Sequence, residues 1–203
     1  MPPESSHRMF FNYHADNWDH EECSEKISTL HNIIQELNFL SLGNILDIGA
    51  GTGIMVPIIK CKTAPENYLI ELDISLEMLK INRHKWINTQ RNLVQLNSDA
   101  LKIPFKKESF TGIICFAVLP HLANKKSALK ECYRVLAGKG KLLILHLMSS
   151  ELLNRYHKDV GGAVENDHLE SVEQLSRQLK DIGFRILKAE EKEDLHLILA
   201  VKK

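Results

Sequence analysis

A chain of 203 residues, 44% of them hydrophobic, can bury one substantial core and is short for two separate domains. Its 26 basic and 26 acidic residues give a formal charge of +0, without the positive surplus that holds a nucleic-acid backbone. No apolar run approaches the roughly 18 residues of a membrane span, and residues 1–22 lack the features of a secretory signal. We therefore expect a cytoplasmic protein of one domain that binds neither nucleic acid nor a membrane.

Apolar residues at intervals of three and four predict a first helix at residues 24–40. Short apolar runs and helical periodicity then alternate along the rest of the chain. Strands are predicted at residues 44–49, 68–73, 93–99, 112–119, 141–147, 184–191 and 194–202, and helices at 54–61, 75–86, 125–137, from about 150, and at 172–183.

This alternation predicts an α/β fold, a doubly wound, Rossmann-like sheet of seven mostly parallel strands with helices on both faces. The last two strands follow each other closely, so the last strand is expected to be antiparallel. In such a sheet ligands bind beyond the carboxyl ends of the strands. The residues at those ends are therefore the first candidates for a site.

Acidic residues and glycines follow the first three predicted strands. Asp47 precedes Gly49, Gly51 and Gly53, and Asp73 and Asp99 end the next two strands. A glycine loop of longer spacing commonly holds the phosphates of a dinucleotide. Asp47 would repel such phosphates by several kcal/mol at about 4 to 6 Å. A cationic cofactor without phosphate avoids this repulsion, and S-adenosylmethionine, which carries a sulfonium and an ammonium group, has that chemistry.

Four segments resemble, in order, the successive motifs of class I S-adenosylmethionine-dependent methyltransferases of the type 11 kind, which act on small molecules. The segments are "ILDIGAGTG", "IELDISLEMLK", "LNSDALKIPF…SFTGIICFAVLPHL" and "ALKECYRVLAGKGKLLIL", and they cover about residues 43–147. The chain departs from the family at Thr111, where an acid is usual, and at residues 137–140, where Pro-Gly-Gly is usual. Both departures lie away from the expected cofactor contacts.

The resemblance implies a set of cofactor contacts. Asp47 would lie beneath the methionine part, Gly49, Ala50, Gly51 and Gly53 would form the glycine loop, Asp73 would hold the ribose, Asp99 and Ala100 would face the adenine amino group, Ile74 and Leu101 would flank the ring, and Phe116 would lie near the methyl end. Residues 41–203 would form the methyltransferase domain, after an N-terminal helical segment at residues 1–40.

The opening "MFFNYHADNWD" resembles a segment that precedes the fold in many of these enzymes and can lie over the cofactor as a lid. The alternative is that Phe10, Phe11 and Trp18 only pack against the sheet, since aromatic side chains bury well in either arrangement. The sequence leaves these two interpretations open.

The acceptor of the methyl group is expected to be a small molecule. The fourth strand ends in "FAVLPHL", without the Asn/Asp-Pro-Pro-Tyr/Phe pattern with which resembling enzymes hold a planar amide or amino nitrogen. The neutral composition argues against a large RNA or DNA substrate. The identity of the acceptor and the oligomeric state do not follow from the sequence.

Histidines near the strand ends are the candidates for chemistry at the acceptor. His121 is the first choice as a general base, and His146 is the second catalytic candidate. Together with His157 they could bind a divalent metal that ionises a thiol or hydroxyl acceptor. Asp167 and Glu165, in the loop that follows, are expected to support a histidine or to contact an amine substrate, and the alternative is that this loop is only a solvated connection. The alternative is that His146 is a hydrogen-bonded strand-end residue and His157 a surface helix residue.

Two other function classes compete with a methyltransferase. One is a non-catalytic binding module that keeps the fold, and the other is an NAD-dependent oxidoreductase. The oxidoreductase would need the longer glycine spacing and a dinucleotide that tolerates Asp47.

Overall fold

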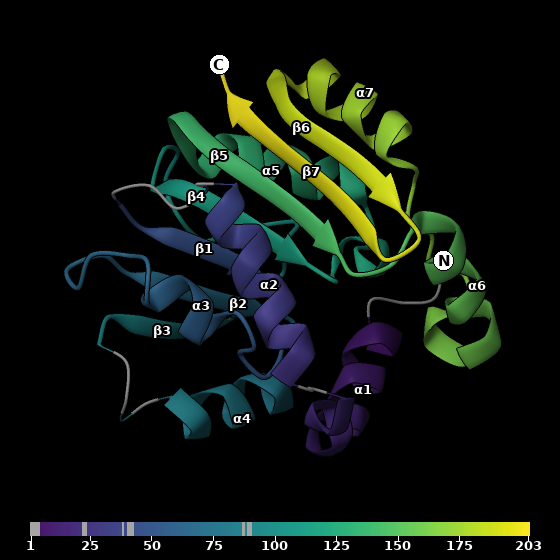
Figure 1. Cartoon of the computed structure of the whole chain (residues 1–203). Helices are drawn as coiled ribbons and strands as arrows, with labels where there is room; N and C mark the ends of the chain where they lie inside the picture. Colours follow the sequence, from purple (N-terminus) through teal and green to yellow (C-terminus); the bar gives the residue numbers. More distant parts are fainter. Residues whose placement is uncertain (1–4, 22–23, 38, 40–42, 87, 89–90) are drawn as a thin grey trace.

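A sheet of seven strands, in the order β3-β2-β1-β4-β5-β7-β6, forms the centre of the molecule (Figure 1). The computed structural model describes residues 5–21, 24–37, 39, 43–86, 88 and 91–203. The strands are β1 (Ile45–Ile48), β2 (Leu69–Asp73), β3 (Leu93–Asn97), β4 (Phe110–Phe116), β5 (Leu136–His146), β6 (Phe184–Lys192) and β7 (Leu195–Lys202). Strands β1 to β5 pair in parallel, and β7 is antiparallel to both β5 and β6. The predicted α/β fold with an antiparallel last strand is confirmed.

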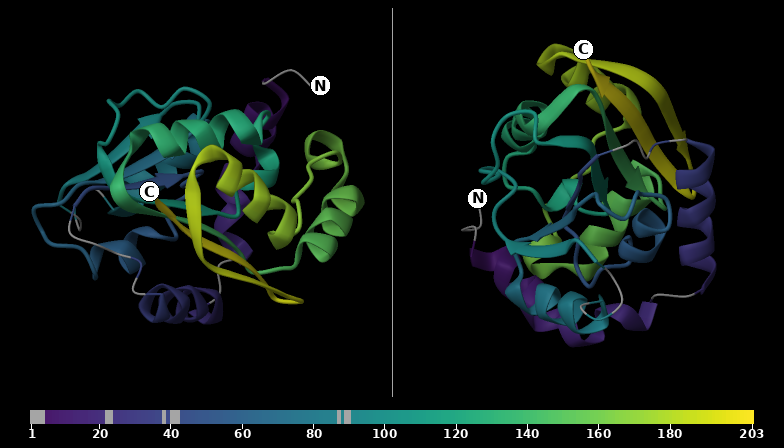
Figure 2. Two further views of the ribbon diagram at one scale, coloured as in Figure 1. Left: turned by 90° about the horizontal axis from the view of Figure 1, so that it is seen from above. Right: turned by 90° about the vertical axis from the view of Figure 1, so that its left-hand side faces the viewer.

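Helices cover both faces of this sheet. The α-helices are α1 (Ser5–His14), α2 (Ser24–Glu36), α3 (Val56–Lys60), α4 (Leu76–Trp86), α5 (Lys125–Val135), α6 (Ser150–Val160) and α7 (Val172–Ile182), and the 3₁₀ turns are η1 (Ala15–Glu21), η2 (Leu119–His121) and η3 (Gly162–Val164). Seen from above, the sheet lies between α2 on one side and α5 on the other (Figure 2). No helix within the described ranges is long and apolar enough to cross a membrane.

Two hydrophobic clusters fill the two faces, and alternate residues of one strand belong to different clusters. Ile113 packs with α5 and α7, whereas Ile114 packs with α2 and α3. This alternation follows from the pleat, which points successive side chains to opposite faces. The central strands are buried on both sides and are therefore nearly continuous apolar runs.

Element boundaries differ from the sequence prediction by three residues or more at three places. Helix α2 ends at Glu36 rather than at residue 40, and residue 40 itself lies outside the described ranges, as does the predicted domain boundary after it. Strand β5 begins at Leu136, five residues before its predicted start, because Leu136 pairs with Phe110 in a bulged register. Strand β4 ends at Phe116, since Ala117 has a φ of 53° and a 3₁₀ turn that contains Pro120 follows.

Helices α1 and α6 lie at the end of the sheet toward which the arrows of β4 and β5 point (Figure 1). The carboxyl ends of β1, β2 and β4 therefore face an N-terminal helix rather than open solvent. This edge is where a doubly wound fold binds its ligand.

Candidate functional site

The loop after β1 turns sharply beneath the edge of the sheet. Gly49 has a φ of 71°, and a Cβ added there would meet the side chain of Val118. The position therefore requires glycine for both its left-handed conformation and its lack of a side chain. Gly53, at the other end of the loop, backs onto the side chains of Asn82 and Trp86. The loop is thus closely packed at both ends while its middle faces the site.

Asp73, the last residue of β2, holds this loop in place. The amide of Gly51 donates a hydrogen bond of 2.8 Å to Oδ2 of Asp73, and the amide of Ser75 donates one of 2.7 Å to Oδ1. Burial raises the pKa of Asp73, while these two amides lower it. Each carboxylate oxygen keeps a further lone pair, so the group can still accept hydrogen bonds from a ligand.

Asp47 lies below the loop rather than in the open site. The residue is 1% exposed, and its Oδ2 has no hydrogen-bond partner among the described residues. Burial raises the pKa of Asp47 well above its usual range, with a smaller contribution from the neighbouring Glu71. The same burial raises the pKa of Glu71 to about 8. Two buried acids beneath one loop make a local environment that favours protons or a cation.

A cavity of about 470 Å³ opens at these strand ends. Every cofactor-binding residue predicted from the sequence lines it except Asp47 and Gly53: Gly49, Ala50, Gly51, Asp73, Ile74, Asp99, Ala100, Leu101 and Phe116. Asp99 fixes its own turn, because its Oδ1 accepts a 2.8 Å hydrogen bond from the amide of Leu101. Three successive strand ends therefore contribute to one cavity.

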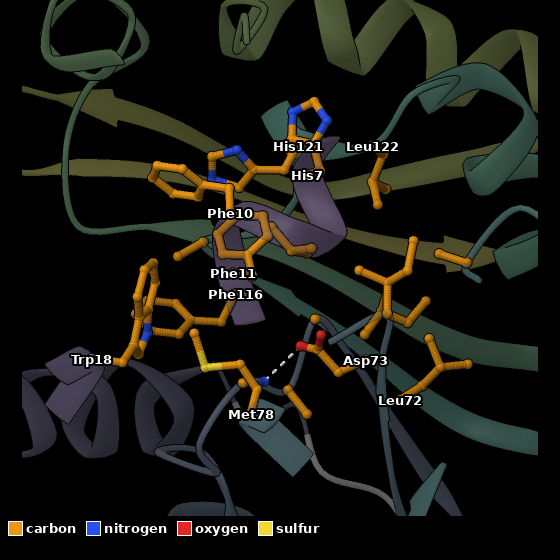
Figure 3. Close-up of a pocket in the computed structure, with 18 of the residues that line it drawn as sticks. His7, Phe10, Phe11, Trp18, Leu72, Asp73, Met78, Phe116, His121 and Leu122 are labelled. Carbon is orange, nitrogen blue, oxygen red and sulfur yellow. Dashed lines mark hydrogen bonds between the residues drawn. The ribbon is translucent and has the colours of Figure 1, made fainter. Parts of the chain in front are cut away.

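The N-terminal segment forms the other side of the cavity. Phe10, Phe11, His14 and Trp18 all line it, together with Lys26 from α2. Figure 3 shows Phe11 and Trp18 near Phe116, while the imidazoles of His7 and His121 lie across the cavity from the Asp73 carboxylate. These aromatic residues thus line the cavity and also pack against one another.

Asn12 attaches α1 to the rest of the site, although the sequence reading did not single it out. Its Oδ1 accepts a 2.7 Å hydrogen bond from the hydroxyl of Ser75, 63 residues further along the chain. Ser75 in turn accepts a hydrogen bond from the amide of Met78, at the start of α4. The helix over the cavity is therefore linked to the same β2–α4 turn that holds the glycine loop.

His121 lies at the cavity wall and bonds to Asp167, as expected for a supporting acid. Its Nδ1 is 2.5 Å from Oδ2 of Asp167. The same carboxylate meets His7, whose Nε2 is 2.9 Å from Oδ1 and 3.0 Å from Oδ2. Hydrogen bonds from both imidazoles lower the pKa of Asp167 against the opposing effect of its burial. His7 was not predicted, because nothing local in the sequence indicates contact with a residue 160 positions away.

His157 is buried rather than a surface residue of α6. It is 4% exposed, and its ring centroid lies 5.0 Å from that of His121. Its Nδ1 is 3.2 Å from the backbone oxygen of Asp167, which fits donation by the ring N–H. Burial, with repulsion from His121, lowers the pKa of His157.

His146, at the end of β5, packs beneath this group. Its ring meets that of His196 edge to face, with centroids 5.7 Å apart, and it is 2% exposed. Burial lowers the pKa of His146 well below its usual range, so the ring is neutral near pH 7. The lining residues of the cavity include His121 but neither His146 nor His157. Within the described part of the chain, one set of three metal-ligand side chains converges, namely His7, His121 and Asp167.

Comparison with known proteins agrees with this geometry. Residues 46–144 match the family model described as "Methyltransferase domain". The chain is 35% identical over 103 residues to the ubiquinone/menaquinone biosynthesis C-methyltransferase UbiE of Wigglesworthia glossinidia brevipalpis, an alignment that covers 50% of this chain and 41% of that protein. The chain spans about half the length of the curated relatives it matches.

Solved structures share the fold at low sequence identity. A SAM-dependent methyltransferase from Thermotoga maritima superposes with a TM-score of 0.75 at 19% identity, covering 97% of this chain and 100% of that one. A SAM-dependent methyltransferase from Aquifex aeolicus superposes with a TM-score of 0.70 at 19% identity, covering 90% and 100%. The sequence match, the fold and the strand-end residues agree, and over residues 46–144 the chain matches the methyltransferase family that its sequence motifs resemble.

Proposed function

We propose that the chain transfers a methyl group from S-adenosylmethionine to a small-molecule acceptor and leaves S-adenosylhomocysteine. The observation that carries this proposal is the shape of one cavity. Its one wall consists of the acidic and glycine-containing strand ends, and its other wall consists of aromatic and imidazole side chains from α1 and η2. A volume of about 470 Å³ falls in the range of small-ligand pockets. Such a cavity can hold a cofactor and a small acceptor side by side.

The strand-end wall is proposed as the cofactor side. Asp73 would bind the ribose hydroxyls with the lone pairs that Gly51 and Ser75 leave free. Asp99 and Ala100 would face the adenine amino group, with Ile74 and Leu101 against the ring and Phe116 near the methyl group. Gly49, Ala50 and Gly51 would let the methionine part approach the backbone. Asp47 would act on the methionine part from below rather than through direct contact, since Asp47 does not line the cavity.

Residues 1–40 are proposed to act as a lid over residues 41–203. Support comes from the two attachments of α1, one through Asn12 to Ser75 and one through His7 to Asp167. Methyl transfer needs an acceptor held in line with the sulfonium and a site from which water is excluded. A helix fixed beside the cavity by hydrogen bonds would contribute to the exclusion of water.

His121 is proposed as the base for an acceptor that carries a proton. Asp167 holds Nδ1 of His121, so that in the neutral ring Nε2 carries the lone pair that takes up the proton. His146 stays a prediction as a catalytic residue, because its buried ring contacts His196 instead of the cavity. The alternative of a metal bound by His121, His146 and His157 is supported at His121, which lines the cavity. For His146 and His157 it rests on the sequence pattern alone.

Cofactor binding is the first test. Calorimetric titration of the purified chain with S-adenosylmethionine, S-adenosylhomocysteine and NAD should give binding for the first two only. A panel of thiols, phenols and amines, assayed for S-adenosylhomocysteine release, then tests the reaction. Binding without turnover on any class would favour the non-catalytic module, and binding of NAD alone would favour the oxidoreductase.

A further inference from the structure

Three side chains from distant segments converge at the acceptor side of the cavity. His7 comes from α1, His121 from the end of η2, and Asp167 from the loop between η3 and α7. Their nitrogen and oxygen donor atoms all lie within 4.8 Å of one another. Their side chains are only 13%, 15% and 9% exposed, respectively. The group is therefore held together inside the fold rather than gathered by chance on its surface.

Two imidazoles and one carboxylate form a ligand set that suits divalent first-row transition metals. Bond lengths of about 2.0 to 2.2 Å around one ion separate neighbouring donors by about 3 to 4 Å. The two imidazole–carboxylate separations, 2.9 Å for His7 and 2.5 Å for His121, need to widen only slightly to reach that spacing. We propose that His7, His121 and Asp167 bind one divalent transition-metal ion, with Zn²⁺, Co²⁺ or Fe²⁺ as the fitting chemistry.

The surrounding residues position this site without using its donor atoms. Asn154 exchanges two hydrogen bonds with the backbone of Leu169, accepting at 2.7 Å and donating at 3.0 Å, and so fixes the loop that carries Asp167. The Nδ1–H of His157 points to the backbone oxygen of Asp167. Outer contacts of this kind orient metal ligands in proteins.

The location of His7, His121 and Asp167 has two consequences for a bound ion. His7 and His121 line the cavity, so the remaining coordination positions face the acceptor side. An oxygen, nitrogen or sulfur atom of an acceptor could occupy such a position. With Nδ1 of His121 on the ion, Nε2 of that ring would carry the proton, so the ion and not His121 would then help the acceptor to lose its proton. Because His7 belongs to α1, the ion would also fasten this helix over the cavity. Ion binding itself goes beyond the proposed methyl transfer and can be measured without it.

Cobalt is a suitable probe, because Co²⁺ bound to protein nitrogen and oxygen donors absorbs visible light. The full chain, stripped with a chelator, is titrated with Co²⁺ and then with competing Zn²⁺, and bound metal is counted by elemental analysis. The native chain should bind about one ion. His7→Ala and Asp167→Asn should each weaken binding by at least about tenfold, while His168→Ala, at an exposed neighbour of Asp167, should bind like the native chain.

The Asp167→Asn substitution leaves the size of the side chain nearly unchanged. Circular dichroism shows whether each variant folds. Hydrogen exchange of residues 5–14 gives a second readout, since Zn²⁺ should slow exchange in the native chain and not in Asp167→Asn. The proposal is overturned if the native chain binds no ion. It is equally overturned if binding survives both substitutions, or if it is lost in His196→Ala but not in His7→Ala.

Discussion

The amide of Gly51 donates a 2.8 Å hydrogen bond to the carboxylate of Asp73, 22 residues further along the chain. One acid therefore both shapes the glycine loop and faces the proposed ribose position. Asp73→Ala removes the hydrogen bond that holds the glycine loop and the proposed ribose contact together. We expect S-adenosylmethionine to bind more weakly by about 1.5 to 3 kcal/mol, or roughly tenfold to a hundredfold, by calorimetry. Asp181→Ala, at an exposed acid of α7, is the matched control; equal affinity in both variants would refute the role of Asp73.

Substitutions at Gly49 and Gly51 test separately the stability of the fold and the affinity for the cofactor. Both have a positive φ, 71° and 53°, but a Cβ on Gly49 would meet Val118, whereas a Cβ on Gly51 meets nothing within 4 Å. Gly49→Ala should lower the free energy of unfolding by about 2 to 5 kcal/mol, from backbone strain and overpacking together. Gly51→Ala should lower it by only about 1 to 2 kcal/mol. The methyl group added by Gly51→Ala enters the cavity, so the affinity for the cofactor should fall although the variant still folds.

Thermal unfolding and calorimetry of the two glycine variants supply the measurements. A similar loss of Tm in both variants would contradict the steric role of Val118. Unchanged cofactor affinity in a folded Gly51→Ala chain would contradict the position of the glycine loop beside the cofactor.

The strand-end residues could be predicted because local pattern determines them. Alternating strands and helices fix a parallel sheet, and a parallel sheet brings Asp73 and Asp99 to one edge. The acceptor side depends instead on contacts between distant segments. His7 meets Asp167 across 160 residues and Asn12 meets Ser75 across 63, and neither pairing leaves a periodic signal. The histidines were expected at the site, but which of them converge depends on how α1 docks.

The start of β5 was also predicted wrongly from local pattern. The apolar run alone predicts a strand that begins at residue 141, after Gly138 and Gly140. In the structure β5 already begins at Leu136, beside Phe110 of β4. Pairing with a neighbouring strand supplies the hydrogen bonds that outweigh the low strand propensity of glycine.

The buried acid Glu71 predicts how stability depends on pH. Its pKa is about 8 in the folded chain, against an ordinary value of 4.5, because burial disfavours the charged form. The folded state therefore binds more protons than the unfolded state between about pH 4.5 and 8, and stability falls as pH rises through this window. Glu71→Gln keeps an acceptor for the Asn82 amide, which lies 2.9 Å away, and removes the titration.

Denaturant unfolding of native and Glu71→Gln chains from pH 5 to pH 8 tests this linkage. The difference in stability should shift in favour of the variant by up to about 1.4 kcal/mol per pH unit. Glu193→Gln, at an exposed acid, should follow the native curve. Parallel curves for native and Glu71→Gln chains would show that Glu71 is already ionised at pH 5.

The attachment of α1 through Asn12 can be weakened without touching the cavity lining. Asn12→Ala deletes the acceptor of the 2.7 Å hydrogen bond from Ser75, a bond worth about 0.5 to 1.5 kcal/mol. Hydrogen exchange in residues 5–14 should become severalfold faster, and the KM for the acceptor should rise. Met9→Ala, on the outward face of α1 and 69% exposed in the native chain, is the control. Unchanged exchange in Asn12→Ala would mean that other contacts hold the helix.

His121 and His146 are both candidate catalytic residues, and their surroundings predict different losses. His121 lines the cavity and is held by Asp167, so His121→Ala should lower kcat by about a hundredfold to ten-thousandfold for an acceptor that must lose a proton. Its affinity for S-adenosylmethionine should stay within a factor of about two to three, because the ring lies across the cavity from Asp73 (Figure 3). His146 is buried against His196, so His146→Ala should chiefly lower Tm by leaving a cavity in the fold. Activity assays at a temperature below the Tm of each variant separate the loss of kcat from the loss of stability, because turnover is then counted per folded molecule. A kcat that collapses in His146→Ala and survives in His121→Ala would move the catalytic role to the buried ring and require a proton path from it to the cavity.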